Sequence, residues 1–390
     1  MKEIKPADRI SHVEEYYFSR KLKEVARMNG DGGLPVISLG VGGPDFMPSQ
    51  QTIFALMEDV MKPDAHSYQS YVGLPALRKA WSDFYHRWYD VDLDPSCEMI
   101  PLIGSKEGIM HVSMALLNPG DKVLVPDPGY PTYSSVSKLV GAEIIKYDLK
   151  YENDWEPDFA ALENTPGIDE VKVMWVNYPH MPTGHCASLE LLERIVDFGR
   201  RHGIVIINDN PYSFILNEQP LSIMQVEGAK DVCLEFNSMS KSHSMAGWRQ
   251  GIVVGKKEYI DWVLRVKSNV DSGMFRPVMK AAIAALGAPQ EYFTQLNEAY
   301  RVRRIAAEQI MHYLGCEFDP AQRGLFLWGR IPDKYDHCEE LTEPILHKAR
   351  VFLTPGFIFG RNGERFVRIS LCAPFEKMQE ALLRIKAAGL

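Results

Sequence analysis

The stretch DVCLEFNSMSKSHSMAGWRQGIVVG, residues 231–255, decides the fold class of this chain. An apolar run typical of a buried strand leads into a polar segment rich in serine, and a second apolar run follows it. Lys241 lies inside the polar segment and Arg249 closes it. A surface lysine needs no such setting, whereas a lysine that meets a bulky anionic ligand at the end of a strand would.

Several other apolar runs repeat this pattern along the chain. KVLVPDPGYP, EIIKYDL, EVKVMWVNYP and GIVIINDNPY each begin like a buried strand, and the first, third and fourth end in turn residues. The segment SLELLERIVDFGRRHG, residues 188–203, has apolar residues at helical spacing and a stop signal at Gly203. Strands that alternate with helices predict an α/β fold with a mostly parallel, doubly wound sheet.

Polar side chains follow three of these predicted strands. Asn177, Asp209 and the group of Ser238 and Lys241 each come directly after an apolar run. For any one of these residues, an ordinary polar turn is the simpler explanation. Ligands of open parallel sheets bind just beyond the carboxyl ends of the strands, so the set taken together predicts one shared site.

The segment GSKEG, residues 104–108, predicts a cradle for an anion. It follows a predicted strand and opens a helix expected from about Lys106 to Leu117. Gly104 permits close approach of the backbone, and Ser105 with the first helix amides can donate to an anion. Ser105 could equally be an ordinary helix cap, and the segment does not match a P-loop.

Composition narrows the class of protein. The 390 residues carry a formal net charge of −8 and are 46% hydrophobic and 24% charged, which permits a large core and argues against a nucleic-acid partner. We find no apolar run long enough for a membrane span and no apolar core of a signal peptide near the N-terminus. The six cysteines are scattered, which fits free thiols in the cytoplasm.

These groups match the needs of pyridoxal 5'-phosphate. This cofactor requires a lysine that forms a Schiff base with its aldehyde, a carboxylate at its pyridine nitrogen and an anion site for its phosphate. Lys241 can be the first and Asp209 the second. The anion site can be supplied by four residues, Ser105, Lys106, Ser238 and Arg249. No metal is expected.

The order of motifs resembles that of the class I/II aminotransferases, which are pyridoxal-phosphate enzymes of fold type I. The motifs are SYQSYVGLPALRKA, GSKEG, VPDPGYPTY, NYPHMPTG, NDNPY, SMSK, GWR and VRIS, and the resemblance runs from SLGVGGPDF (38–46) to RFVRISLC (365–372). Eight ordered matches make this signal specific. GSKEGI, DPGYPTY and KSNVDSGMF are more similar to the branch of LL-diaminopimelate aminotransferase than to the aspartate branch.

The resemblance implies roles for individual residues around the cofactor. Lys241 matches the Schiff-base lysine that also moves the substrate proton, and Asp209 matches the partner of the pyridinium. Tyr212 matches the tyrosine that bonds the phenolic oxygen, and Tyr130 the aromatic that stacks on the ring. The phosphate shell would again consist of Ser105, Lys106, Ser238 and Arg249.

Other roles concern the substrate and a second subunit. Tyr68 matches a tyrosine that reaches the phosphate of the neighbouring subunit, which implies a homodimer with shared sites, and Tyr71 is the alternative. Arg368 matches the arginine that grips the substrate α-carboxylate, and Arg365 is the alternative. Gly42 matches a backbone contact to the same carboxylate.

One motif departs from the family pattern. NYPHMPTG has Met181 where the family usually has an asparagine that donates to the phenolic oxygen of the cofactor. A methionine cannot donate in this way. The resemblance therefore leaves three alternatives: Asn177 takes the role, His180 takes it, or Tyr212 acts alone.

The expected protein has a large cofactor-binding domain at 50–285 and a small domain at 286–390, which residues 1–49 complete as an arm and loop. The implied reaction is ping-pong transamination between an L-amino acid and a 2-oxo acid. The rival interpretations are a C–S lyase or decarboxylase on the same fold, or a regulator that binds the cofactor without turnover. Arg276 and residues 10–17 could face the substrate side chain.

Overall fold

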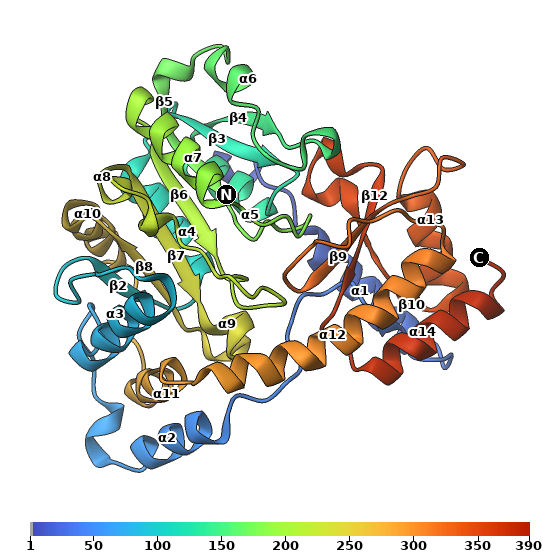
Figure 1. The fold of residues 1–390 in the computed structure, drawn as a ribbon, viewed down its shortest axis with the longest axis horizontal. Helices are drawn as coiled ribbons and strands as arrows, with labels where there is room; N and C mark the ends of the chain where they lie inside the picture. Colours follow the sequence, from blue (N-terminus) through green and yellow to red (C-terminus); the bar gives the residue numbers. More distant parts are fainter. Residues whose placement is uncertain (1–2) are drawn as a thin grey trace.

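A seven-stranded sheet forms the centre of the computed structural model, which describes residues 3–390 (Figure 1). Its strand order is β2-β8-β7-β6-β5-β3-β4, and only β8 runs antiparallel to its neighbours. The predicted α/β fold with a mostly parallel sheet is confirmed. The strands are β2 (Met99–Leu102), β3 (Lys122–Asp127), β4 (Glu143–Asp148), β5 (Val171–Val176), β6 (Val205–Asn210), β7 (Cys233–Ser238) and β8 (Gly251–Gly255).

Helices cover both faces of this sheet, because successive side chains of each strand point to opposite sides. Ile207 packs in a core with α4, α5 and α10, whereas its neighbour Ile206 packs in the core that contains α3 and α7. The sheet is therefore doubly wound. The helices around it are α2 (Gln50–Val60), α3 (Pro75–Tyr89), α4 (Ser105–Leu116), α5 (Pro131–Val140), α6 (Phe159–Glu163), α7 (Leu189–His202), α8 (Ala229–Val232), α9 (Met239–Ser242), α10 (Lys257–Lys267) and α11 (Arg276–Leu286).

The helix α7 shows how local sequence sets these boundaries. Ser188 caps its start by accepting a hydrogen bond from the backbone of Leu191 at 3.0 Å, and Gly203 ends it in the left-handed conformation at φ 66°. The stop at Gly203 was predicted from the sequence. The helix α4 begins at Ser105 and ends at Leu116, each one residue earlier than expected.

The C-terminal part contains two smaller sheets. The long helix α12 (Gln290–Tyr313) leads from the large sheet to a three-stranded antiparallel sheet, and a two-stranded parallel sheet lies beside it (Figure 1). The proposed domain limits at 49/50 and 285/286 remain predictions. The remaining elements here are β1 (Ile37–Ser38), β9 (Phe326–Arg330), β10 (Val351–Phe352), β11 (Thr354–Pro355), β12 (Phe366–Ser370), α13 (Glu339–Pro344) and α14 (Phe375–Ala387).

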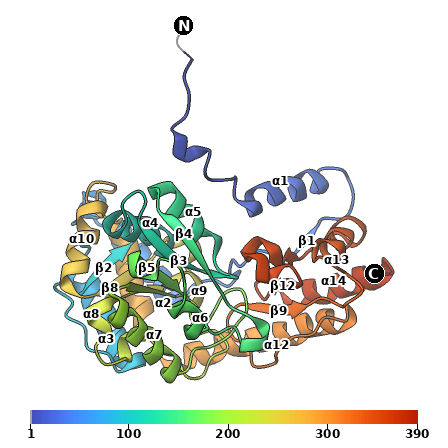
Figure 2. The same cartoon turned by 90° about the horizontal axis from the view of Figure 1, so that it is seen from above.

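The expectation of an arm and a loop for the N-terminal segment was incomplete. Residues 17–29 form the helix α1 (Tyr17–Asn29), which packs on Leu346 and Phe352 through Val25. Only Val25 is fully buried in this helix, so its sequence carries a weak signal. Figure 2 shows the chain before α1 extending away from the body; residues 1–2 of the predicted arm lie outside the described residues. Within residues 3–390, no helix is long and apolar enough to cross a membrane.

Candidate active site

A cavity of about 520 Å³ lies beyond the carboxyl ends of β5, β6 and β7. The large sheet supplies one wall, β9 and β12 supply another, and the chain before and at the start of α1 adds Tyr16 and Phe18. Every residue predicted for the site lines this cavity except Tyr68. Those that line it are Gly42, Ser105, Lys106, Tyr130, Asn177, Asp209, Tyr212, Ser238, Lys241, Arg249 and Arg368.

Lys241 lies on the short helix α9, which begins directly after β7. Ser238 holds the start of that helix by accepting a hydrogen bond from the backbone of Ser240 at 3.2 Å. The ammonium group of Lys241 donates to the carbonyl of Gly42. Burial lowers the pKa of Lys241, and the guanidinium charges of Arg368 and Arg249 lower it further. A lowered pKa favours the free amine, which is the form that attacks an aldehyde.

Asp209 is a buried carboxylate, and one of its two oxygens has no hydrogen-bond partner among the described residues. Its Oδ2 accepts a hydrogen bond from the hydroxyl of Tyr133 at 2.9 Å, whereas Oδ1 has no partner anywhere in residues 3–390. Burial raises the pKa of Asp209 to about 6, against the hydrogen bond from Tyr133 and the charge of Lys241. A buried oxygen of this kind requires a donor. A protonated ring nitrogen would satisfy it.

Tyr133 is a site residue that the sequence interpretation missed. Its ring stacks on Trp175 with a centroid distance of 4.9 Å and an interplanar angle of 8°, and it is fully buried. This packing aims its hydroxyl at Asp209. The signal was present in VPDPGYPTY, where Tyr133 follows Tyr130 by one helical turn at the start of α5.

The turn before α4 and the side chain of Arg249 form a positively charged cup. Gly104 has φ 81°, and a Cβ atom there would lie 2.0 Å from Nη2 of Arg249. The close approach therefore requires glycine. Ser105 and Lys106 are the first residues of α4, and burial lowers the pKa of Lys106, with a further contribution from Arg249. A helix start with two nearby cationic groups is suited to a phosphate.

Aromatic side chains close the cavity above and beside this cup. Burial raises the pKa of Tyr130 and of Tyr212, so both hydroxyls stay protonated and can donate. Tyr16 belongs to the segment that we expected to face the substrate, and its ring lies 4.8 Å from the ammonium of Lys106. The N-terminal segment therefore contributes directly to the site.

Arg368 on β12 is buried and lines the same cavity. Its Nη2 donates to the carbonyl of Gly40 at 2.8 Å, its Nη1 lies 3.2 Å from the sulfur of Met181, and its guanidinium lies 3.9 Å from the ring centroid of Phe326. Burial lowers its pKa to about 10, so it remains charged at neutral pH. The alternative, Arg365, lies outside the cavity and pairs with Asp333 at 3.0 Å.

The structure narrows the alternatives raised by Met181. Met181 lines the cavity, as does Asn177, whose amide donates to the carbonyl of Asp209 and whose Oδ1 accepts from the backbone of Met181 at 2.8 Å. His180 is turned away and lies 2.8 Å from the hydroxyl of Thr183. His180 does not line the cavity, which favours Asn177 or Tyr212 for this role.

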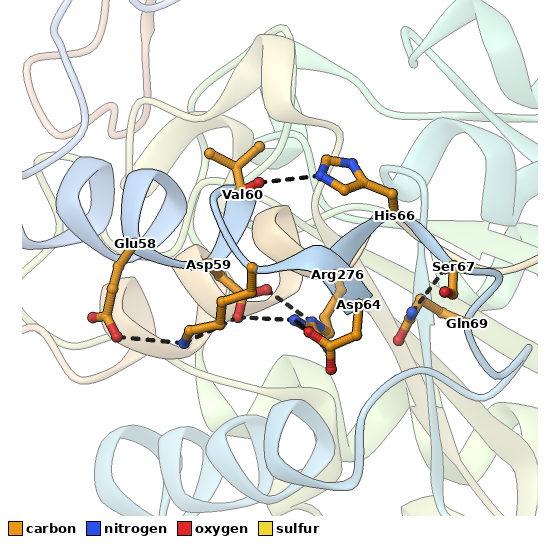
Figure 3. A network of polar contacts seen from close by, with 9 residues as sticks. Glu58, Asp59, Val60, Asp64, His66, Ser67, Gln69 and Arg276 are labelled. Atoms are coloured by element: carbon orange, nitrogen blue, oxygen red, sulfur yellow. Dashed lines mark hydrogen bonds and ion pairs between the residues drawn. The ribbon is translucent and has the colours of Figure 1, made fainter.

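Tyr68 and Arg276 lie outside the cavity of this chain. Tyr68 is 89% exposed, and Tyr71 is also exposed. Arg276 pairs with Asp59 at 2.9 Å and with Asp64 at 2.6 Å, so it joins α11 to the end of α2 and to the segment that follows it (Figure 3). Arg276 does not line the cavity of its own chain, and its suggested place near the substrate side chain stays a prediction.

Comparison with known proteins identifies the family. The family described as "Aminotransferase class I and II" matches residues 35–385. The chain belongs to this family. LL-diaminopimelate aminotransferases from Aquifex aeolicus and Halothermothrix orenii are 40% and 39% identical to it, over 97% and 98% of this chain and 98% of each relative. The substrate-bound structure of BacF from Bacillus subtilis is similar, with 34% identity, a TM-score of 0.93, and coverage of 99% of this chain and 98% of that one.

The protein is thus an aminotransferase that uses pyridoxal 5'-phosphate, and the residues of the cavity fit that cofactor. The unpartnered Oδ1 of Asp209 suits the ring nitrogen, and the buried amine of Lys241 suits the aldehyde. The glycine at position 104 lets the guanidinium of Arg249 lie against the turn at the start of α4, which suits a phosphate. Substrates of such enzymes are amino acids and 2-oxo acids.

Proposed function

We propose that this aminotransferase transfers the amino group of a dicarboxylic L-amino acid of the diaminopimelate type to a 2-oxo acid, by a ping-pong mechanism. The names of the two relatives at 39–40% identity support the type of substrate. The observation that carries the proposal is the combination, in one cavity, of a free amine, a carboxylate with an open oxygen and a buried arginine: Lys241, Asp209 and Arg368.

In this proposal the cavity residues divide the cofactor between them. When bound, pyridoxal phosphate supplies an electron sink that stabilises negative charge at the α-carbon of the substrate. Asp209 keeps the proton on the ring nitrogen, while Tyr212 and Asn177 face the phenolic oxygen and Tyr130 stacks on the ring. Ser105, Lys106, Ser238 and Arg249, which line the same cavity, would hold the phosphate.

Lys241 and Arg368 would act on the substrate. Lys241 would hold the cofactor through its amine and would take and return the α-proton of the substrate as a general base and acid. Arg368 binds the α-carboxylate through a charge-assisted pair, and the backbone at Gly42 completes that contact. Phe326 and Phe359 flank the guanidinium and exclude water from the pair.

We also propose a cytoplasmic homodimer with shared sites. The exposed face of α2 carries Phe54, Met57 and Met61, which are 62%, 55% and 82% exposed, and exposed Tyr68 follows shortly after. These side chains have the helical spacing of one apolar face, which a second copy of the chain would cover. The six free cysteines support the reducing compartment.

A panel of amino donors with 2-oxoglutarate tests the substrate. We expect LL-diaminopimelate to convert the bound cofactor to its amino form, seen as a loss of its visible absorbance, and 2-oxoglutarate to restore it. Reduction with borohydride before adding substrate should fix the cofactor to Lys241, which peptide mapping detects. A label on another lysine, or no conversion with any amino acid, would refute the proposal.

A further inference from the structure

Four polar side chains meet beside the phosphate cup without lining the cavity. They are Glu107 and His111 on α4, Lys267 at the end of α10, and Asp271 in the loop that follows. The carboxylates of Glu107 and Asp271 and a ring nitrogen of His111 lie within 4.8 Å of one another. Lys267, which is fully buried, donates to both oxygens of Asp271 at 2.9 and 2.7 Å. The ammonium group supplies the positive charge that this group of acids requires.

Glu107 connects this cluster to the turn that forms the cup. Its Oε2 accepts a hydrogen bond from the backbone N–H of Ile103 at 2.7 Å, and its Oε1 lies 2.8 Å from Nε2 of His111. In a capping box, a glutamate at the third helical position bonds the N–H of the cap residue. Here it reaches one residue further back, and among the described residues no side chain caps the start of α4. The N–H groups around Ser105 are thereby left for an anion.

Asp271 connects the same cluster to the segment that carries Tyr68. Its Oδ1 also accepts from the backbone of Gly273 at 2.8 Å. Gly273 has φ 87°, and a Cβ there would lie 2.5 Å from the carbonyl of Gln69, so the loop packs directly on the residue after Tyr68. The cluster therefore connects the turn of the phosphate cup with the segment that carries Tyr68, which in the proposed dimer would reach the phosphate site of the partner subunit.

We propose that Glu107 is a positioning residue for the cofactor phosphate: bonded to His111, and close to the pair of Lys267 and Asp271, it fixes the peptide at Ile103 and so the geometry of the turn at Gly104–Lys106. This inference rests on the phosphate site proposed above. Removal of the Glu107 carboxylate releases the Ile103 N–H and loosens the turn. Affinity for the phosphate group should then fall, while affinity for the pyridine ring and aldehyde stays.

The test compares pyridoxal phosphate with pyridoxal, which lacks the phosphate. The full-length protein, freed of cofactor, is titrated with each ligand, and thermal unfolding confirms that each variant is folded. We expect Glu107→Ala to raise the dissociation constant for pyridoxal phosphate by about tenfold, the loss of about 1.4 kcal/mol, and to leave that for pyridoxal unchanged. Glu107→Gln retains an acceptor for Ile103 and should restore most of the affinity.

Two further variants make the result decisive. Glu190→Ala removes an exposed glutamate from the first turn of α7 and should change neither constant. Glu107→Asp keeps the charge but is too short to reach both partners, so a partial, phosphate-selective loss is expected even if the alanine variant is unstable. The inference would be overturned if the affinities for both ligands fell equally. It would also be overturned if neither Glu107→Ala nor Glu107→Asp lost affinity for pyridoxal phosphate. A wild-type protein that does not prefer pyridoxal phosphate would instead refute the phosphate site itself.

Discussion

At the scale of single residues, burial changes Asp209 and Lys241 in opposite directions. It raises the pKa of the carboxyl to about 6 and lowers the pKa of the amine, so each charged form is disfavoured in the empty cavity. A cofactor with a cationic ring nitrogen and an aldehyde suits both side chains. The carboxylate gains a charged partner, and the neutral amine is the reactive form.

Asp209→Asn should stabilise the cofactor-free protein at pH 8. The pKa of Asp209 is about 6 in the fold and near 3.8 when unfolded, so the folded protein binds this proton more tightly. The stability that the folded protein gains from protonated Asp209 is complete below pH 3.8, falls as pH rises and is lost above about pH 6. The asparagine variant avoids that loss, so it should gain roughly 3 kcal/mol at pH 8 and nearly nothing at pH 4.

Thermal unfolding of both proteins across this pH range measures the effect. The same variant should bind cofactor yet turn over several orders of magnitude more slowly, because the ring nitrogen loses its anionic partner. A stability difference that does not depend on pH would contradict the assigned titration, and near wild-type turnover would contradict the catalytic role.

Met181→Asn should lower the pKa at which the visible absorbance of the bound cofactor titrates. The new amide would donate to the ionised phenolic oxygen, and a hydrogen bond to a charged form lowers the pKa of its group. The shift should not exceed about two pH units, because one such bond contributes about 1.5–3 kcal/mol. An unchanged titration in this variant, with a shift in Asn177→Ala, would show that Asn177 already fills the role.

At the scale of elements, the site depends on strands that end where short helices begin. The helix α9 starts directly after β7 and carries Lys241, and α4 starts two residues after β2 at the phosphate cup. Neither helix has to be long, because the function resides in its first turn. The backbone before each helix must therefore be held in one conformation, which explains the glycine at position 104.

Gly104→Ala should weaken cofactor binding more than backbone strain alone predicts. Gly203 offers a matched control, because it also has a positive φ but a Cβ there would meet nothing within 4 Å. Both alanine variants should lose on the order of 1 kcal/mol of stability from strain. Only the alanine at position 104 would also displace Arg249, so only it should raise the dissociation constant for pyridoxal phosphate. Equal binding by the two variants would show that the clash is relieved without moving Arg249.

At the scale of the whole molecule, the cavity exists only where distant segments meet. Arg368 comes from β12, Gly42 and Tyr16 from the N-terminal part, and Lys241 from α9, which follows β7. Movement between these segments would change the separation of the carboxylate site from the amine. Substrate binding and chemistry therefore depend on packing across the full length of the chain.

Phe54→Glu on the exposed face of α2 should convert the proposed dimer to a monomer at micromolar concentration, because a charge cannot be buried there without a partner. Leu383→Glu, which replaces a 66% exposed leucine on α14, is the control and should leave the association unchanged. Sedimentation velocity measures both. A wild-type chain that sediments as a monomer, or equal effects of the two changes, would refute this interface.

The sequence by itself determined the mostly parallel sheet and the end of α7, because these follow from local signals. Apolar runs predicted the strands, Gly203 predicted the end of α7, and polar residues after strands predicted that Asn177 and Asp209 would lie at one edge of the sheet. Parallel strands bring their carboxyl ends to one edge, so residues far apart in the sequence could be grouped before any contact was known.

Only the tertiary structure decided which side chains face the cavity and which are held elsewhere. Arg365 and Arg368 differ by three residues on or beside one strand, yet only Arg368 is buried in the site. The guanidinium of Arg276 pairs with Asp59 and Asp64, more than 200 residues earlier in the chain, through contacts that no local pattern predicts. Partners come from other elements, so side-chain direction and pairing are settled by packing rather than by the neighbouring sequence.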